Sequence, residues 1–257
     1  MAGYEKGPGG FVQKKTRRKN KPTNTKIFRP ETVKILEKGI DRETEIPNFA
    51  EATEDPVFAC FVIDASPSMS PYRDDVIKSH PVMLDTLRAS AKCKNDALYV
   101  IQYTFSLTPV RLHPFEKLDV RKQDKVAVLN SQNYNPDKGD STSLYDTVFD
   151  LLKEMTVCIE QGYEDGIKST FSIAVISDGD DNTSKINPAD IRSVIEELRD
   201  KRYLRSSVVL GLLNQQFSKQ RLEEIKNVLG FEKAVPLDRD PKSIRRAFEL
   251  ASRSSVS

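Results

Sequence analysis

Oxygen-bearing side chains gather in three short segments of the sequence. DASPS at 64–68 offers Asp64, Ser66 and Ser68, STSLYD at 141–146 offers Thr142, and ISDGDD at 176–181 offers Asp178. Two carboxylates and three hydroxyls, without His or Cys, form a ligand set that hard divalent cations prefer. An incomplete protein cage completed by water favours Mg²⁺, and Mn²⁺ or Ca²⁺ would also be tolerated. The cation would also remove the repulsion between the two carboxylates.

Two of these segments directly follow apolar runs that predict strands buried on both faces. VFACFVI at 57–63 leads into Asp64, and FSIAVIS at 171–177 leads into Asp178. In open parallel sheets, ligand sites form beyond the carboxyl ends of strands, where the connections diverge to opposite faces. We therefore expect both segments at one edge of a sheet, with Thr142 nearby at the N-terminus of a helix.

The rest of the chain alternates strands with amphipathic helices, which predicts an α/β fold with a doubly wound, mainly parallel sheet and helices on both faces. Further strands are expected at 98–105, 109–115, 207–213 and 233–237, the proline-containing 109–115 as an antiparallel edge strand. Helices are expected at 71–92, 142–155, 191–201, 219–230 and 243–252. Pro81 would disturb the first of these helices, and Gly230 would end the fourth.

The N-terminal region differs in charge from the rest. Residues 1–30 hold nine Lys or Arg and one Glu, a balance of +8, whereas the remaining residues hold 31 basic and 37 acidic groups. Residues 1–30 show no apolar periodicity and are predicted to be a basic disordered tail. Residues 31–55 are expected to form a short helix and a linker or arm, and 56–257 the main domain.

The apolar runs and the cysteines indicate in which cellular compartment the protein is expected. No run approaches the roughly 18 apolar residues of a membrane span, and MAGYEKGPGG does not look like a secretory signal. The three cysteines have no CxxC spacing. These features favour a cytoplasmic protein with reduced thiols, with Cys60 buried in its apolar run.

The motifs resemble those of the von Willebrand factor A (vWA) domain and its metal-ion-dependent adhesion site. The family pattern is D-x-S-x-S after the first strand, a Thr in a G-T-x-L-type loop, and an Asp opening D-G after the fourth strand. The resemblance covers roughly Val57 to Ser257, in the form seen in bacterial cytoplasmic vWA proteins. It implies that Asp64, Ser66, Ser68, Thr142 and Asp178 hold the metal. Pro67 replaces the usual Gly, and Asp140-Ser141 replaces a common Gly-Gly, but neither change removes a ligand.

Each motif also has an ordinary structural interpretation. Ser68 and Thr142 could simply cap helices, and Asp178-Gly179 could simply form a turn. Asp146 is interpreted as a helix-facing or supporting group, and Asp180 and Asp181 as solvated acids near the site. The three motifs in family order, each at a strand or helix end, favour the metal site.

The resemblance implies a protein-interaction module in which a Mg²⁺-type ion captures a Glu or Asp of a partner. Candidate partners are an AAA+ ATPase of the MoxR type or a signalling or stress-response assembly. A second hypothesis is nucleic-acid binding through residues 1–30, by salt-sensitive contacts of the basic tail. A metal-dependent hydrolase is the third, but the only histidines, His80 and His113, lie outside the three segments, so no catalytic set is evident.

Overall fold

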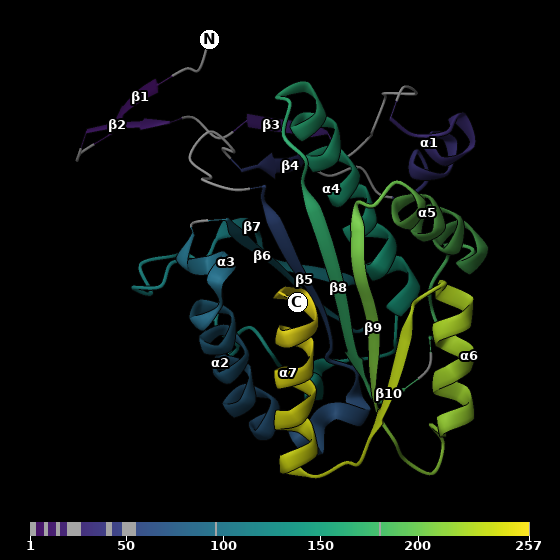
Figure 1. The fold of residues 1–257 in the computed structure, drawn as a ribbon. Coiled ribbons are helices and arrows are strands. Elements are labelled where there is room, and N and C mark those ends of the chain that lie inside the picture. The colour runs from purple at the N-terminus through teal and green to yellow at the C-terminus, as the bar shows by residue number, and fades with distance from the viewer. Residues whose placement is uncertain are drawn as a thin grey trace.

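A six-stranded sheet forms the centre of the molecule (Figure 1). The computed structural model describes residues 4–7, 10–13, 16–19, 27–39, 43–47, 55–95, 97–179 and 181–256. The strands of the sheet are β5 (Val57–Asp64), β6 (Leu98–Phe105), β7 (Pro109–Lys117), β8 (Thr170–Ser177), β9 (Leu204–Leu212) and β10 (Lys233–Leu237). Their order is β10-β9-β8-β5-β6-β7, and all neighbours are parallel except β6 and β7, which are antiparallel. The predicted fold class and the antiparallel edge strand are confirmed.

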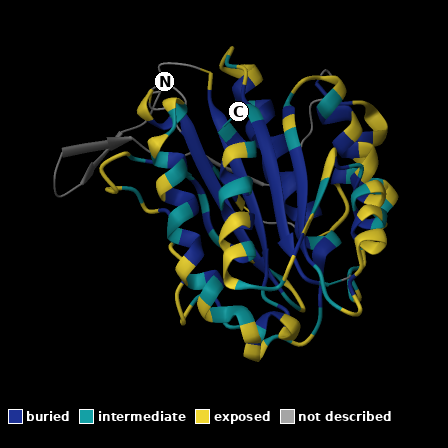
Figure 2. Cartoon of the chain, turned by 60° about the horizontal axis from the view of Figure 1, so that its bottom comes forward, coloured by how far each residue is buried: buried dark blue, intermediate teal, exposed yellow. Residues whose placement is uncertain are grey.

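Helices cover both faces of this sheet. They are η2 (Pro67–Tyr72), α2 (Arg73–Ala89), α3 (Ala91–Lys94), η3 (Pro136–Lys138), α4 (Leu144–Glu164), α5 (Pro188–Asp200), α6 (Lys219–Leu229) and α7 (Pro241–Val256). Helices α2 and α7 lie together on one face, and α4, α5 and α6 lie on the other (Figure 1). Alternate residues of β5 enter two separate cores: Phe58 and Val62 pack below α4 and α5, whereas Phe61 and Ile63 pack below α2 and α7. Figure 2 shows the resulting buried sheet between helices with exposed outer faces.

The predicted helices are found with shifted ends. Residues 71–92, predicted as one helix, fall into the end of η2, then α2, then α3, and Pro81 lies inside α2. Gly230 ends α6 in the left-handed conformation, with φ 71°, as its lack of a Cβ allows. Helix α4 continues nine residues beyond Met155, where the sequence predicted its end, because its later turns are also buried.

The N-terminal segment departs from the sequence prediction. Strands β1 (Tyr4–Gly7), β2 (Gly10–Gln13) and β3 (Thr16–Lys19) lie in the span expected to have no regular structure. The predicted short helix is α1 (Pro30–Leu36), and the expected linker contains β4 (Glu43–Ile46), which pairs antiparallel with β3. Backbone pairing stabilises such strands without apolar periodicity, which is why the pattern did not reveal them. The remaining residues of 1–26 and 48–54 lie outside the described part of the chain.

Side chains of the N-terminal segment enter the main core. Ile27, Phe28, Leu36 and Ile46 are each at most 4% exposed and belong to the cluster below α4. Lys153 of α4 donates from Nζ to the carbonyl of Lys38 at 2.9 Å. Residues 27–39 and 43–47 therefore contribute side chains to the domain's hydrophobic core.

None of the helices in the described segments is both long and apolar enough to span a membrane. Cys60, Cys93 and Cys158 form no disulfide within the described residues, and all three are buried, as predicted for Cys60. Burial raises the pKa of the Cys60 and Cys158 thiols well above the ordinary value, so both are neutral.

Candidate metal centre

The carboxyl ends of β5 and β8 bring two of the sequence motifs together. These strands are parallel neighbours, with Ile63 opposite Ile176. The chain leaves β5 through η2 and α2 toward one face, and leaves β8 toward α5 on the other face. The pair is therefore the switch point at which open α/β sheets form ligand sites. Asp64 is the last residue of β5, and Asp178 follows the last residue of β8.

Four of the five predicted ligands lie in one chain of hydrogen bonds. The Ser66 amide donates to Asp64 Oδ1 at 2.8 Å, and the Ser66 and Ser68 hydroxyl oxygens are 3.0 Å apart. The Ser68 hydroxyl donates to Asp178 Oδ1 at 2.6 Å. Ser66, not Ser68, precedes η2, and its side chain caps no amide of that helix. The loop thus turns both hydroxyls toward the carboxylates, and Pro67 occupies the first helical position, where a missing N–H costs little.

Asp64 has two hydrogen-bond donors at its carboxylate and a third group at its main-chain oxygen. It is fully buried, and its carboxylate also accepts a hydrogen bond from the Ser177 hydroxyl at 2.5 Å. Burial, and then the nearby Asp178 charge, raise the pKa of Asp64 from 3.8 to about 6, although the hydrogen bonds from Ser177 and Ser66 oppose the rise. The Tyr134 hydroxyl donates to the Asp64 main-chain oxygen at 2.8 Å and so fixes the strand end.

Asp178 is also buried, but a positive charge lies beside it. Arg239 forms an ion pair with Asp178 Oδ2 and donates to the Asp178 carbonyl oxygen at 3.2 Å. Asn214 donates to the same carbonyl at 2.9 Å. Burial raises the pKa of Asp178, and the hydrogen bond from Ser68 and the charge of Arg239 act in the opposite direction.

Thr142 lies in the neighbouring loop, but its hydroxyl takes no part in the hydrogen-bond chain of the other four residues within the described segments. Its side chain is nearly buried, and the loop is held through its backbone. The Thr142 amide donates to Asn182 Oδ1 at 2.8 Å, and its carbonyl accepts from the Asn182 amide at 3.0 Å. Ser143, not Thr142, precedes α4, so the helix-cap interpretation of Thr142 is wrong.

The acidic residues around the motifs have structural roles. Asp181 accepts hydrogen bonds from the Tyr145 amide at 3.1 Å and from the Ser184 hydroxyl, so it is not the solvated acid that the sequence predicted. Asp146 accepts from the amides of Lys185 and Ile186, each at 2.9 Å, which agrees with the supporting role expected of it. Both carboxylates tie the segment after Asp178 to the start of α4. Asp180 lies outside the described residues.

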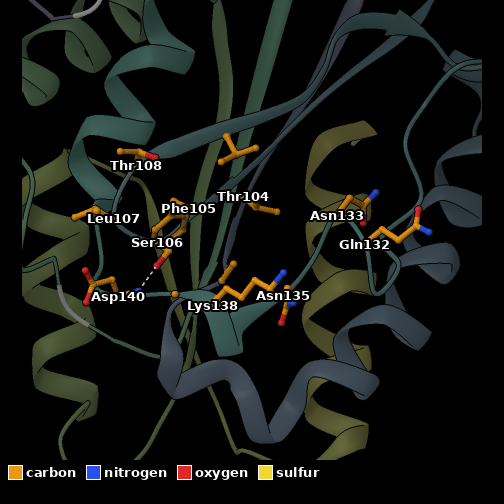
Figure 3. Close-up of a pocket in the computed structure, with 13 residues that line it drawn as sticks. Thr104, Phe105, Ser106, Leu107, Thr108, Gln132, Asn133, Asn135, Lys138 and Asp140 are labelled. Carbon is orange, nitrogen blue, oxygen red and sulfur yellow. Dashed lines mark hydrogen bonds between the residues drawn. The ribbon is translucent and has the colours of Figure 1, made fainter.

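A pocket of about 440 Å³ opens beside the D-x-S-x-S loop (Figure 3). Its lining includes Ala65 of that loop and Lys138, Gly139 and Asp140 of the loop before Thr142. The Ser106 hydroxyl accepts a hydrogen bond from the Asp140 amide at 3.0 Å (Figure 3). A Cβ on Gly139 would lie 2.8 Å from the Ala65 carbonyl oxygen, so glycine lets these two loops approach each other closely.

The donor set fits a hard divalent cation. Two buried carboxylates and two hydroxyls converge, and Asp64 carries a raised pKa because burial and Asp178 both disfavour its charge. A cation between such carboxylates relieves both penalties. Across the described segments, no group of three or more His, Cys, Asp or Glu side chains is placed to hold a metal ion. Any site here therefore relies on hydroxyl and water ligands beside the two carboxylates, as Mg²⁺ sites commonly do.

Three contacts at the site were not predicted from the sequence. Ser177 could have been found from strand pairing, because the residue after Ile176 must lie beside the end of β5. Tyr134 and Arg239 had no such signal, since they lie in loops 70 and 61 residues from their partners. Both histidines lie elsewhere, hydrogen-bonded to Gln102 in the core.

Comparisons with known proteins identify similar folds. No protein-family model and no curated protein matches the chain. The PilB minor pilin from Streptococcus sanguinis is 15% identical with a TM-score of 0.52, over 84% of this chain and 64% of PilB. The pilus adhesin SpaC from Lactobacillus rhamnosus GG is 8% identical with a TM-score of 0.52, over 84% of this chain and 31% of SpaC. The vWF domain of the pilus tip protein Mfa5 from Porphyromonas gingivalis is 11% identical with a TM-score of 0.47, over 79% of this chain and 95% of that domain.

The matched part of this chain spans less than two thirds of PilB and of SpaC, so the likeness concerns the fold alone. The chain therefore has an α/β fold of the kind found in these two pilus proteins, whereas its resemblance to vWA domains rests on its three sequence motifs.

Proposed function

We propose that this chain is a protein-interaction module that binds a divalent cation, Mg²⁺ in the first instance, and through it an acidic side chain of a partner protein. The observation that carries the proposal is the hydrogen-bond chain from Asp64 through Ser66 and Ser68 to Asp178. Residues 110 positions apart in sequence meet there at the switch point of the sheet. A cation held by few carboxylates keeps net positive charge and a coordination position for an outside carboxylate.

The pocket beside the loop supplies room for the chain that carries the partner's acid. Leu107 and Val110 line it and are 52% and 51% exposed, so they can pack against apolar side chains of a partner. Lys138 also lines it and offers a positive charge to an acidic segment. The surface thus combines apolar contact with attraction for an acidic peptide.

The metal half of the proposal is tested by calorimetric titration of Mg²⁺ and Mn²⁺. The wild-type chain should bind one ion, and Asp178→Ala should lose the binding because it removes one of only two carboxylates. Asp165→Ala is the matched control, since Asp165 is an exposed carboxylate at the end of α4. Equal binding by wild type and Asp178→Ala would exclude this site.

The partner half is tested by affinity capture read by mass spectrometry, with and without EDTA. Proteins captured by wild type and by Asp165→Ala, but lost with EDTA and with Asp178→Ala, are the expected result. An AAA+ ATPase of the MoxR type and a signalling or stress-response assembly are the partner classes proposed, in a cytoplasmic setting. A captured partner that binds equally well in EDTA and to Asp178→Ala would contradict metal-mediated capture.

A further inference from the structure

The candidate metal centre already contains one positive charge, the guanidinium of Arg239. It lies between β10 and α7, directly ahead of Asp240. Its Nη2 atom contacts both Oδ2 and the carbonyl oxygen of Asp178. Its side chain is 20% exposed, whereas that of Asp178 is 0% exposed. The ion pair therefore joins a fully buried carboxylate to a guanidinium at the edge of solvent.

The four carboxylate oxygens of the site have different partners. Oδ1 of Asp64 accepts from the Ser66 amide, and Oδ2 accepts from Ser177. Oδ1 of Asp178 accepts from Ser68, and Oδ2 accepts from Arg239. Among these donors, all within the described residues, only Arg239 is charged. Its positive charge partly neutralises the two buried carboxylates, as a bound metal ion would also do.

The remaining contacts of Arg239 are weaker. Its guanidinium carbon lies 5.3 Å from the ring centroid of Tyr72, the last residue of η2. Its buried Nε has no hydrogen-bond acceptor among the described residues. A guanidinium has five N–H donors, and that of Arg239 therefore leaves part of its hydrogen-bonding capacity unused among the described residues. The ion pair with Asp178 is thus the main interaction that holds the side chain in the site.

We propose that the Arg239 guanidinium and the divalent cation compete for the Asp178 carboxylate, so that Arg239 sets the affinity of the site for metal. The inference rests on the proposed function, because it assumes that the site binds a cation. Two cations cannot both approach Oδ2 closely without mutual repulsion. Metal binding therefore requires Arg239 to move away from Asp178, and the free energy of the lost ion pair is subtracted from that of metal binding.

The test is calorimetric titration of Mn²⁺ and Mg²⁺ into wild type, Arg239→Gln and Arg245→Gln. Arg245 is an exposed residue of α7 paired with Glu249, so its substitution removes the same charge from a distant surface. Arg239→Gln should bind metal on the order of tenfold more tightly than wild type, since a charge-assisted hydrogen bond no longer has to be broken. Arg245→Gln should match wild type. Unchanged or weaker binding by Arg239→Gln would overturn the proposal and would make Arg239 a group that only positions Asp178.

A second measurement covers the case in which Arg239→Gln does not fold. In wild-type protein, the ¹H–¹⁵N resonance of the Arg239 Nε–H group should shift when Mg²⁺ is added to saturation, because the guanidinium leaves Asp178. An unchanged resonance in metal-saturated protein would overturn the competition between Arg239 and the metal, but not the metal site itself. Absence of metal binding in both wild type and a folded Arg239→Gln would overturn the proposed metal site, and this inference with it.

Discussion

Ser177 shows how one hydroxyl adjusts the charge of the candidate metal centre. Its hydrogen bond to Asp64 Oδ2 is 2.5 Å long and lies in a fully buried environment, where a carboxylate without a donor is costly. The same hydrogen bond opposes the rise in the pKa of Asp64 that burial and Asp178 cause. Ser177 therefore favours the charged form of Asp64, which is the form that binds a cation.

Replacement of Ser177 by Ala should destabilise the protein and weaken metal binding. Removal of a buried hydrogen bond to a charged group costs about 1.5–3 kcal/mol. Urea unfolding at neutral pH should show this loss, and metal titration should show weaker binding by the folded variant. Ser193→Ala is the control, because Ser193 is exposed on α5 and donates only to the Ala189 carbonyl. Equal stability of the two variants would show that the Ser177 hydroxyl has no such role.

Among single residues of the candidate metal centre, the sequence predicted those at the ends of strands and missed those that lie in distant loops. Asp64 and Asp178 were predictable because an apolar run marks the strand before each of them. Arg239 follows β10 in sequence, yet its contact with Asp178 depends on the path of the loop into α7. Local pattern carries no information on that path, so the ion pair could be found only in the three-dimensional structure.

At the scale of elements, a buried hydrogen-bond network joins α2, β6 and β7. Gln102 of β6 hydrogen-bonds to His80 of α2 and, at 3.0 Å, to His113 of β7. The Leu129 amide donates to His80 Nδ1, and the carbonyl of Pro114 lies 2.7 Å from His113 Nδ1. Because His80 Nδ1 accepts from the Leu129 amide, the proton of His80 lies on Nε2, which donates to Gln102 Oε1. The Gln102 side-chain amide in turn donates to His113 Nε2. Both imidazoles are therefore neutral in this arrangement.

The network predicts that both histidines take up a proton at lower pH than a histidine in the unfolded chain does. Burial lowers the pKa of His80 from 6.5 to about 4 and also lowers the pKa of His113. Because the unfolded chain takes up these protons and the folded chain does not, the two groups stabilise the fold above pH 6.5. The contribution of His80 is lost as the pH falls from 6.5 toward 4, and that of His113 is lost as the pH falls below 6.5. In NMR titration, the His80 imidazole signals should keep neutral chemical shifts at pH 5.5, and the His113 midpoint should lie below 6.5. A midpoint near 6.5 for either residue would contradict the network.

The prediction of α4 shows where periodicity alone fails. The sequence indicated one apolar face ending near Met155, but the helix continues to Glu164 and is buried on several sides. Lys153 and Glu154 are buried because each finds a partner: Lys153 binds the Lys38 carbonyl, and Glu154 pairs with Arg111 at 2.8 Å. Charged residues with partners can occupy a core, and a pattern of apolar residues does not show those partners.

For the whole molecule, the segment formed by residues 27–39 and 43–47 is part of the folded domain. Phe28 is 1% exposed and packs into the cluster below α4, and Arg29 pairs with the buried Glu197 of α5 at 3.5 Å. The predicted boundary near residue 56 separates the vWA-like motifs from this segment, but the hydrophobic core extends across it. Nucleic-acid binding through residues 1–30 stays a prediction, since the side chains of residues 1–26 lie outside the described part of the chain.

Truncation of Phe28 to Ala should therefore destabilise the entire domain. Loss of a buried Phe side chain costs about 3–5 kcal/mol, and urea unfolding should show this as one cooperative transition at lower denaturant. Leu107→Ala is the comparison, because Leu107 is 52% exposed and its loss should change stability by no more than about 0.5 kcal/mol. A Phe28→Ala variant as stable as Leu107→Ala would place the segment outside the cooperative unit.

We propose that the ends of β5 and β8 form one divalent-cation site with room for an acidic side chain of a partner protein. An anomalous difference map of crystals of the full chain grown with Mn²⁺ would locate this ion. We predict one strong peak among Asp64, Ser66, Ser68, Thr142 and Asp178, with the Arg239 guanidinium displaced from Asp178. A Mn²⁺-saturated crystal with no peak at these residues would rule out the site, and a peak whose coordination shell is filled entirely by the protein's own side chains would rule out capture of a partner's acidic side chain.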